Sequence, residues 1–160
     1  MVAARRRMPA SGIAYDGEFI LTADHVVERD EDIHVTLPDG TRLEASVAGR
    51  DAGSDLALLR LEKAVASPAE PALERPRIGQ LALALGRPST DGIQASLGVV
   101  SAVGGQWRTG RGGMLEGYLR TDTIPYPGFS GGPLHGVGHG VREGGQRISV
   151  ALRHSLSSFG

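Results

Sequence analysis

The sequence predicts an all-β fold, in the form of paired β-barrels or a β-sandwich. Glycine supplies 24 of the 160 residues, about twice its usual share, and no short repeat accounts for it. The apolar runs are short and are separated by turn signals, and no long amphipathic helical pattern occurs in the chain. Many turns between short strands explain all three observations.

The first sixty residues read as strands joined by tight turns. Residues 11–27, "SGIAYDGEFILTADHVV", place two apolar runs around Asp16-Gly17, a strong hairpin dipeptide. Residues 32–51 alternate apolar and polar positions on both sides of Pro38-Asp39-Gly40, which predicts a half-buried hairpin. "SDLALLRLE", residues 54–62, predicts one more strand, with Ala57, Leu59 and Leu61 on the face opposite Leu56, Leu58 and Arg60.

A proline-rich segment without periodicity separates these strands from a second set. Within residues 63–80, "KAVASPAEPALERPRIGQ", we predict a linker at 67–80 between an N-terminal lobe (1–66) and a C-terminal lobe (81–160). Strands return in the second lobe at "LALALG", "IQASLGVVSAVGG" and "GYLRTDTI".

Composition excludes several classes of function. A formal net charge of −1 argues against nonspecific binding to nucleic acid or to a membrane surface. The absence of cysteine removes disulfides, thiolate nucleophiles and zinc–thiolate sites. No segment has the run of eighteen or more apolar residues that predicts a membrane span. The start, "MVAARRRMPASG", has no apolar stretch of the kind found in signal peptides, and the compartment is left open.

The histidines outside the motifs described below are expected to be ordinary. His135 and His139 are four residues apart, but "HGVGHG" is a poor helix former and no carboxylate cluster accompanies it. We therefore expect no metal site and no cofactor. His34 and His154 are expected to be surface or core residues.

One turn carries residues suited to acyl transfer. "PYPGFSGGPLHG", residues 125–136, sets Ser130 between Gly128 and a Gly131-Gly132 pair. Glycine is used where the backbone takes a positive φ or approaches another group closely. A serine on such a turn has a presented hydroxyl, and its neighbouring N–H groups are free to point outward. A surface turn is the alternative, since these residues are common in turns.

Two further residues have the types that such a serine requires. A serine hydroxyl is a weak nucleophile until an imidazole takes its proton, and the imidazole needs a carboxylate on its other nitrogen. His25 lies at the end of a predicted strand, before a segment that could form one helical turn. Asp55 opens the strand at 54–62, with Asp51 as a nearby competitor. The N–H groups of Gly128 and Ser130, on either side of Phe129, are the candidate oxyanion donors.

Four motifs in order give the chain a family resemblance. "SGIAYDGEFILTADHVV", "DLALLRL", "ASLGVVSAVGG" and "TDTIPYPGFSGGPL" together resemble the trypsin-like serine proteases of the bacterial HtrA (DegP-type) family, from Ser11 to Leu134. The resemblance implies a chymotrypsin-like fold of two β-barrels. It also implies that His25 is the general base, Asp55 the orienting acid and Ser130 the nucleophile.

The resemblance extends to substrate and assembly. It implies that residues 119–128 line the entrance beside the nucleophile, which places Tyr126 and Pro127 among the substrate-binding residues. It also assigns "RISVAL", residues 147–152, as the strand that walls the substrate pocket, with Ser149 and Val150. Such proteases act on polypeptides, usually accept small or medium apolar side chains, are often trimers and usually work outside the bacterial cytoplasm.

The sequence departs from the family pattern in two places. Phe129 stands where the family most often has a polar residue, and we expect its ring to pack under the turn. After Leu134 the sequence offers no counterpart for the family's last strand and helix or for a PDZ-type domain, which leaves the completeness of the second barrel open. An exposed strand edge would result from a missing closing strand.

Two functions therefore follow from the sequence. The first is a serine endopeptidase that cuts unfolded or exposed polypeptides. The alternative is a catalytically inactive protease-like fold that binds peptides or partner proteins. An esterase of the α/β-hydrolase fold is disfavoured, because there the nucleophile precedes the acid and the base along the chain.

Overall fold

The computed structural model describes residues 1–4, 10–64, 68–72, 75–108, 110, 112–115, 117–137 and 147–149. Within these residues the only helical element is one 3-10 turn, η1 (Asp24–Val26), and all other regular structure is β-strand. The predicted all-β class is therefore confirmed. In this part of the chain no helix has the length and apolar character needed to cross a membrane.

The first sheet is built from the N-terminal strands and is antiparallel throughout. Its spatial order is β1-β4-β5-β6-β3-β2. Both predicted hairpins are confirmed, because β2 pairs with β3 around Asp16-Gly17 and β4 pairs with β5 around Pro38-Asp39-Gly40. The strands are β1 (Val2–Ala4), β2 (Ile13–Ala14), β3 (Phe19–Ala23), β4 (Ile33–Thr36), β5 (Arg42–Asp51) and β6 (Leu56–Leu61).

The second sheet has the order β12-β9-β8-β13-β14-β7. All its neighbours are antiparallel except β7 and β14, which are parallel. A separate two-stranded hairpin, β10–β11, lies between β9 and β12 in the sequence. The strands are β7 (Glu70–Pro71), β8 (Leu81–Ser89), β9 (Gly92–Gly104), β10 (Trp107–Arg108), β11 (Met114–Leu115), β12 (Tyr118–Thr121), β13 (Leu134–Val137) and β14 (Arg147–Ser149).

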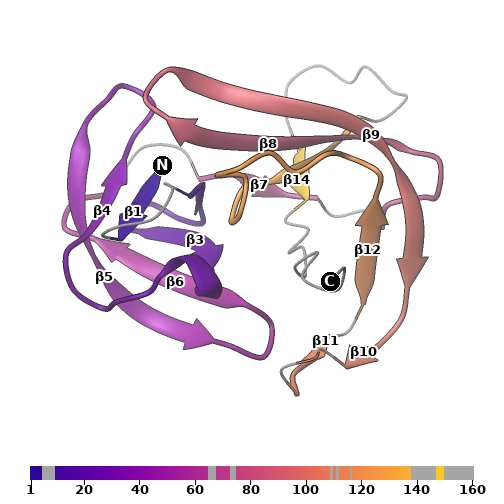
Figure 1. The fold of residues 1–160 in the computed structure, drawn as a ribbon, viewed down its shortest axis with the longest axis horizontal. Helices are drawn as coiled ribbons and strands as arrows, with labels where there is room; N and C mark the ends of the chain where they lie inside the picture. Colours follow the sequence, from indigo (N-terminus) through magenta and orange to yellow (C-terminus); the bar gives the residue numbers. More distant parts are fainter. Residues whose placement is uncertain are drawn as a thin grey trace.

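The two sheets occupy different halves of the molecule. In Figure 1 the indigo-to-magenta strands curl around one another, and the long β8–β9 hairpin runs across the top before β9 turns down the opposite side. The sheets take their strands from residues 2–61 and 70–149. Part of the segment predicted as a linker, β7, is hydrogen-bonded to β14 of the second sheet.

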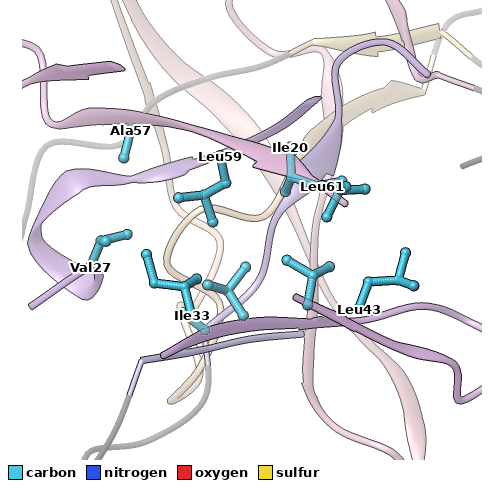
Figure 2. Packing of buried hydrophobic residues seen from close by; sticks show 10 residues of the cluster. Ile20, Val27, Ile33, Leu43, Ala57, Leu59 and Leu61 are labelled. Carbon is cyan, nitrogen blue, oxygen red and sulfur yellow. The ribbon is translucent and has the colours of Figure 1, made fainter. Parts of the chain in front are cut away.

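An apolar core fills the first sheet. The face of β6 that carries Ala57, Leu59 and Leu61 is buried, as its alternation predicts, and Leu59 has no exposed surface. Figure 2 shows these side chains directed toward Val27, Ile33 and Ile20 from the neighbouring segments. The buried members of the cluster are Val2, Ala10, Ile20, Val27, Ile33, Val35, Leu43, Ala57, Leu59 and Leu61.

Among the described residues, the core of the second sheet is smaller. Its described buried cluster consists of Ala82, Val100 and Leu134, with Ala84 and Leu119 packed against it. Two of these five are alanines, so this described cluster as a whole buries less apolar surface than the cluster of the first sheet.

Candidate active site

Sheet pairing brings His25 beside Asp55. Ala23, the last residue of β3, pairs with Leu56, the first residue of β6. The η1 turn follows β3 directly, and Asp55 directly precedes β6. The end of one strand and the start of its neighbour therefore present these two residues at the same edge of the first sheet.

Three hydrogen bonds join the η1 turn to Asp55. The backbone N–H of Asp24 donates to the Asp55 carbonyl at 3.0 Å. The backbone N–H of His25 donates to Oδ1 of Asp55 at 2.9 Å, and His25 Nδ1 lies 2.7 Å from Oδ2. Because both carboxylate oxygens contact the same histidine, its ring orientation is set by Asp55.

The backbone of Asp55 takes an uncommon conformation to do this. Its φ is +59°, in the left-handed region that aspartate and asparagine tolerate better than most residues. Only 5% of Asp55 is exposed. A buried carboxylate requires hydrogen-bonding partners, and His25 supplies two.

Ser130 completes the group from the other half of the chain. Its Oγ lies 3.2 Å from His25 Nε2, although 105 positions separate the two residues in the sequence. Ser130 is exposed, and 36% of the His25 side chain is accessible. The structure therefore brings the three predicted residues together in the order Asp55, His25, Ser130, and the Ser130 hydroxyl lies at the accessible end of this series.

Asp51, the competing carboxylate, has different partners. It accepts hydrogen bonds from the Ser54 hydroxyl and from the backbone N–H of Gly53. The Ser54 hydrogen bond is the main cause that lowers the pKa of Asp51 below its usual value. Asp51 therefore stabilises the turn that leads to Asp55 rather than contacting His25.

The segment before Ser130 forms a type II β-turn. The N–H of Phe129 donates to the carbonyl of Tyr126 at 3.1 Å, which closes the turn. Pro127 occupies the second position, and Gly128, with a φ of +84°, occupies the third. This combination is the signature of a type II turn, in which the third residue must be left-handed.

The turn leaves the N–H groups of Gly128 and Ser130 available. Phe129 N–H is used within the turn, and Gly132 N–H donates to the Phe129 carbonyl at 2.8 Å. Within the described part of the chain, no hydrogen-bond acceptor is assigned to the N–H groups of Gly128 or Ser130. These are the two groups that the sequence singled out as candidate oxyanion donors.

Phe129 packs beneath the turn, as predicted. It is 7% exposed, and its ring meets Tyr126 edge-on at a centroid distance of 5.5 Å. On the other side the ring lies against Gly86 of β8, where an added Cβ would come within 2.4 Å of the ring. Position 86 must therefore be glycine for Phe129 to occupy this site. Tyr126, on the other side of the ring, is 45% exposed.

Ser149, another of the predicted substrate-binding residues, lies next to β13. Ser149, in β14, pairs with Leu134, the first residue of β13, four positions after Ser130. The strand predicted at residues 147–152 is thus present at Arg147–Ser149. Val150 lies outside the described residues, as do His139 and His154.

The other described histidines are His34 and His135. His34 lies in β4 opposite Glu44, and His135 lies in β13 opposite Leu83 and Ile148. Among the residues that the structure describes, no three histidine, aspartate or glutamate side chains are grouped as they would be to hold a metal ion.

Sequence reasoning did not identify two residues that support the site. Ser11 contacts the turn at residues 126–131, which carries the predicted nucleophile and is called the nucleophile turn below. Arg50 contacts the η1 turn. The Arg50 guanidinium donates to the Val27 carbonyl and lies 3.6 Å from Asp24 Oδ1 and 3.2 Å from Asp30 Oδ1. No sequence pattern marked either residue, because their partners depend on how the strands are arranged in space.

Comparisons with known proteins identify a family to which the chain is similar. The sequence profile described as a trypsin-like peptidase domain matches residues 10–140. The chain is similar to "Serine endoprotease DegS" of Escherichia coli (strain K12), with 36% identity over 133 residues, 80% of this chain and 36% of that protein. It is also similar to "Probable periplasmic serine endoprotease DegP-like" of Buchnera aphidicola subsp. Schizaphis graminum, with 35% identity over 125 residues, 74% of this chain and 25% of that protein.

A solved structure extends the likeness to the fold. The crystal structure of the serine endoprotease from Yersinia pestis matches with a TM-score of 0.67 and 33% sequence identity, covering 84% of this chain and 48% of that one. The chain thus spans about a quarter to a half of the proteins that it matches. The predicted chymotrypsin-like architecture and the resemblance to the HtrA family are confirmed.

Proposed function

This chain belongs to the family of trypsin-like peptidase domains, and we propose that it is a serine endopeptidase that hydrolyses peptide bonds in unfolded or exposed polypeptides. Its relatives are named serine endoproteases, which supports a serine hydrolase role. Since the chain covers only part of those proteins, the substrate class is part of the proposal.

One observation carries the proposal. Asp55, His25 and Ser130 form a continuous hydrogen-bonded chain with contacts of 2.7 and 3.2 Å. A side chain that acts as general base must lie within about 2.6 to 3.2 Å of the atom that it deprotonates. The alternative, an inactive fold that only binds peptides, would be favoured by a histidine far from the serine, and the distance favours the enzyme.

The reaction follows from these contacts. The Oγ of Ser130 attacks the carbonyl carbon of the scissile bond while its proton moves to Nε2 of His25. Asp55, at Nδ1, fixes the tautomer and offsets the positive charge that the ring acquires. His25 then donates this proton to the leaving amine as the C–N bond breaks. Water, deprotonated by the same ring, releases the acyl group and restores Ser130.

The tetrahedral intermediate needs hydrogen-bond donors for its oxygen. The backbone N–H groups of Gly128 and Ser130 flank the nucleophile and lack other partners among the described residues. Donors fixed in advance lower the barrier because they need no reorganisation, and one such donor contributes about 3 kcal/mol. We assign these two groups to the oxyanion hole, with Phe129 between them as the buried anchor of the turn.

The substrate would lie along the segments on either side of the nucleophile. Tyr126 and Pro127 form the exposed part of the turn before Ser130, and Ser149 lies on the strand that flanks β13. By analogy with relatives named periplasmic, we propose a location outside the bacterial cytoplasm. Homo-oligomer formation remains a prediction.

Cleavage of casein and of short peptides by the chain and by its Ser130→Ala variant tests the proposal. Removing the nucleophile of a working triad lowers kcat by about 10⁶, so cleavage by the variant should fall by about this factor. Ser89→Ala, which removes an exposed hydroxyl that binds Asp91 at the β8–β9 turn, should retain the full rate. Equal background cleavage by the unaltered chain and Ser130→Ala would contradict the proposal.

A further inference from the structure

We propose that Ser11 is a positioning residue that holds the turn at residues 126–131 in the conformation in which Gly128 and Ser130 present their N–H groups. The inference rests on the proposed function, because it assigns a role in the reaction to a residue that does not touch the reacting atoms. It arises from a buried hydroxyl whose hydrogen bonds all lead to the nucleophile turn or to the strands that support it.

Ser11 contacts the turn at two points. Its Oγ donates to the carbonyl of Gly128 at 2.7 Å, and its backbone N–H donates to the carbonyl of Ser130 at 2.9 Å. These carbonyls belong to the two residues whose N–H groups form the proposed oxyanion hole. Ser11 is 2% exposed, so water does not compete for either bond.

The same residue is fixed from two other directions. The backbone N–H of Arg87, in β8, donates to Ser11 Oγ at 2.7 Å. The hydroxyl of Thr22, in β3, donates to the Ser11 carbonyl at 2.7 Å, and Thr22 is 1% exposed. Ser11 therefore ties the turn to the strand that leads to His25 and to a strand of the second sheet.

Ser11 controls the orientation of one peptide unit of the turn. The unit between Gly128 and Phe129 is held at its carbonyl by Ser11 and at its N–H by Tyr126. With this unit held at both ends, rotation about its axis would break two hydrogen bonds. The next unit, between Phe129 and Ser130, carries the Ser130 N–H and is held at its carbonyl by the Gly132 N–H at 2.8 Å. With both units held, the backbone on either side of Phe129 keeps the N–H groups of Gly128 and Ser130 in place without bonds of their own, as an oxyanion hole requires.

Close packing leaves the segment little room to move. Gly131 has a φ of +80°, and a Cβ there would lie 2.3 Å from both the Ser11 carbonyl oxygen and Thr22 Oγ1. Only glycine allows the turn to approach the Ser11 segment this closely. The absence of a side chain at position 131 thus lets the turn pack against the Ser11 carbonyl and the Thr22 hydroxyl.

The Ser11→Ala substitution removes the hydroxyl and leaves two polar groups without a partner. The Gly128 carbonyl loses its donor, and the Arg87 N–H loses its acceptor. Because such groups are costly to bury unpaired, the turn is expected to shift toward solvent. The substitution should weaken the stabilisation of the transition state more than the binding of substrate, because the oxyanion donors act mainly in the transition state.

Kinetics and a transition-state analogue test this role. For Ser11→Ala we expect kcat to fall by about 10- to 100-fold and KM to change by less than about threefold, somewhat less than the loss of an oxyanion donor itself. The affinity for a peptide boronic acid, which forms a tetrahedral adduct on Ser130, should fall by a similar factor. Ser101→Ala also removes a hydroxyl-to-carbonyl hydrogen bond, 3.1 Å long, from Ser101 to Arg120. Neither residue belongs to the turn, so this control variant should leave both values unchanged.

A second pair of variants separates the hydroxyl from general packing. Thr and Val have nearly the same shape, so Ser11→Thr and Ser11→Val perturb the buried site equally, but only the first keeps a hydroxyl. Higher kcat and tighter boronate binding in Ser11→Thr support the role, and equal values in the two variants overturn it. An unaffected kcat in Ser11→Ala overturns the role of Ser11 alone, whereas an unaltered chain without turnover or boronate binding overturns the proposed function as well.

Discussion

The two sheets hold the proposed catalytic residues by different means. His25 and Asp55 are at the edge of a sheet with a cluster of ten buried apolar residues, including Leu59 and Ile33. Ser130 lies on a turn next to a sheet whose described buried cluster has three members, Ala82, Val100 and Leu134. In the first sheet apolar packing sets the position of the strand ends.

The nucleophile turn depends instead on polar contacts and close approach. Hydrogen bonds from Ser11 and the packing of Phe129 against Gly86 hold it in place. We infer that stability and the geometry of the proposed site depend on different parts of this chain. Substitutions in the first core should mainly change the free energy of unfolding, and substitutions around the turn should mainly change kcat.

Matched leucine truncations give the largest expected effect on stability. Leu59 is completely buried in the larger cluster, whereas Leu134 is 8% exposed in the smaller one. Leu-to-Ala changes in cores cost about 2 to 5 kcal/mol, depending on the cavity that remains. We expect the free energy of unfolding, measured with urea, to fall by about 4 kcal/mol in Leu59→Ala and by about 2 kcal/mol in Leu134→Ala.

The reverse order of the two losses would contradict this difference between the sheets. A larger loss of unfolding free energy in Leu134→Ala would mean that the second sheet, and not the first, dominates the stability of the chain.

Two arginines provide a smaller and sharper test. Arg50 faces Asp24, which is nearly buried and whose Oδ1 has no hydrogen-bond partner among the described residues. Arg60 pairs with Glu18 at 3.2 Å on the exposed surface. Exposed pairs contribute up to about 1 kcal/mol, and removing one partner of a fully buried pair costs about 3 to 5 kcal/mol. We expect the free energy of unfolding to fall by about 2 kcal/mol in Arg50→Ala and by less than about 1 kcal/mol in Arg60→Ala.

Double substitution shows whether the uncompensated Asp24 charge is the cause. Asp24→Asn in the Arg50→Ala background should recover part of the lost unfolding free energy. No recovery would assign the loss to the Val27 contact or to packing of the Arg50 side chain.

The smallest expected effect is a pH dependence at the turn before Asp55. Ser54 lowers the pKa of Asp51 below its usual value of 3.8. A carboxyl whose pKa is lowered in the folded state stabilises the fold above pH 3.8, and this stabilisation is lost as the pH falls through the lowered pKa. Ser54→Ala should therefore lose less unfolding free energy than the unaltered chain between pH 5 and pH 2.

Urea unfolding at several pH values in this range checks the prediction. Parallel curves for the two proteins would show that the Ser54 hydrogen bond does not act through the charge of Asp51.

Much of the fold was predictable because it depends on local patterns. The alternation around Pro38-Asp39-Gly40 and the face formed by Ala57, Leu59 and Leu61 correspond directly to a hairpin and a buried strand face. The candidate residues His25, Asp55 and Ser130 were identifiable because ordered motifs and the chemistry of acyl transfer require those residue types. The structure then placed them within hydrogen-bonding distance.

Other features depend on partners that are distant in the sequence. Ser11 binds Gly128 across 117 positions, and nothing in the residues around Ser11 indicates that partner. The short strand β7 was part of a segment predicted as a linker, because proline-rich sequence without alternation carries no strand signal. Its pairing with β14 comes from tertiary contact rather than local propensity.

Covalent labelling of the nucleophile tests the central claim most directly. A fluorophosphonate reacts with a serine hydroxyl only where a neighbouring base activates it, so we expect one modified peptide, carrying the label on Ser130. The label should be lost in His25→Ala, because the imidazole 3.2 Å from Oγ is the proposed base. No labelling of Ser130 in the folded chain, or equal labelling in His25→Ala, would contradict the account.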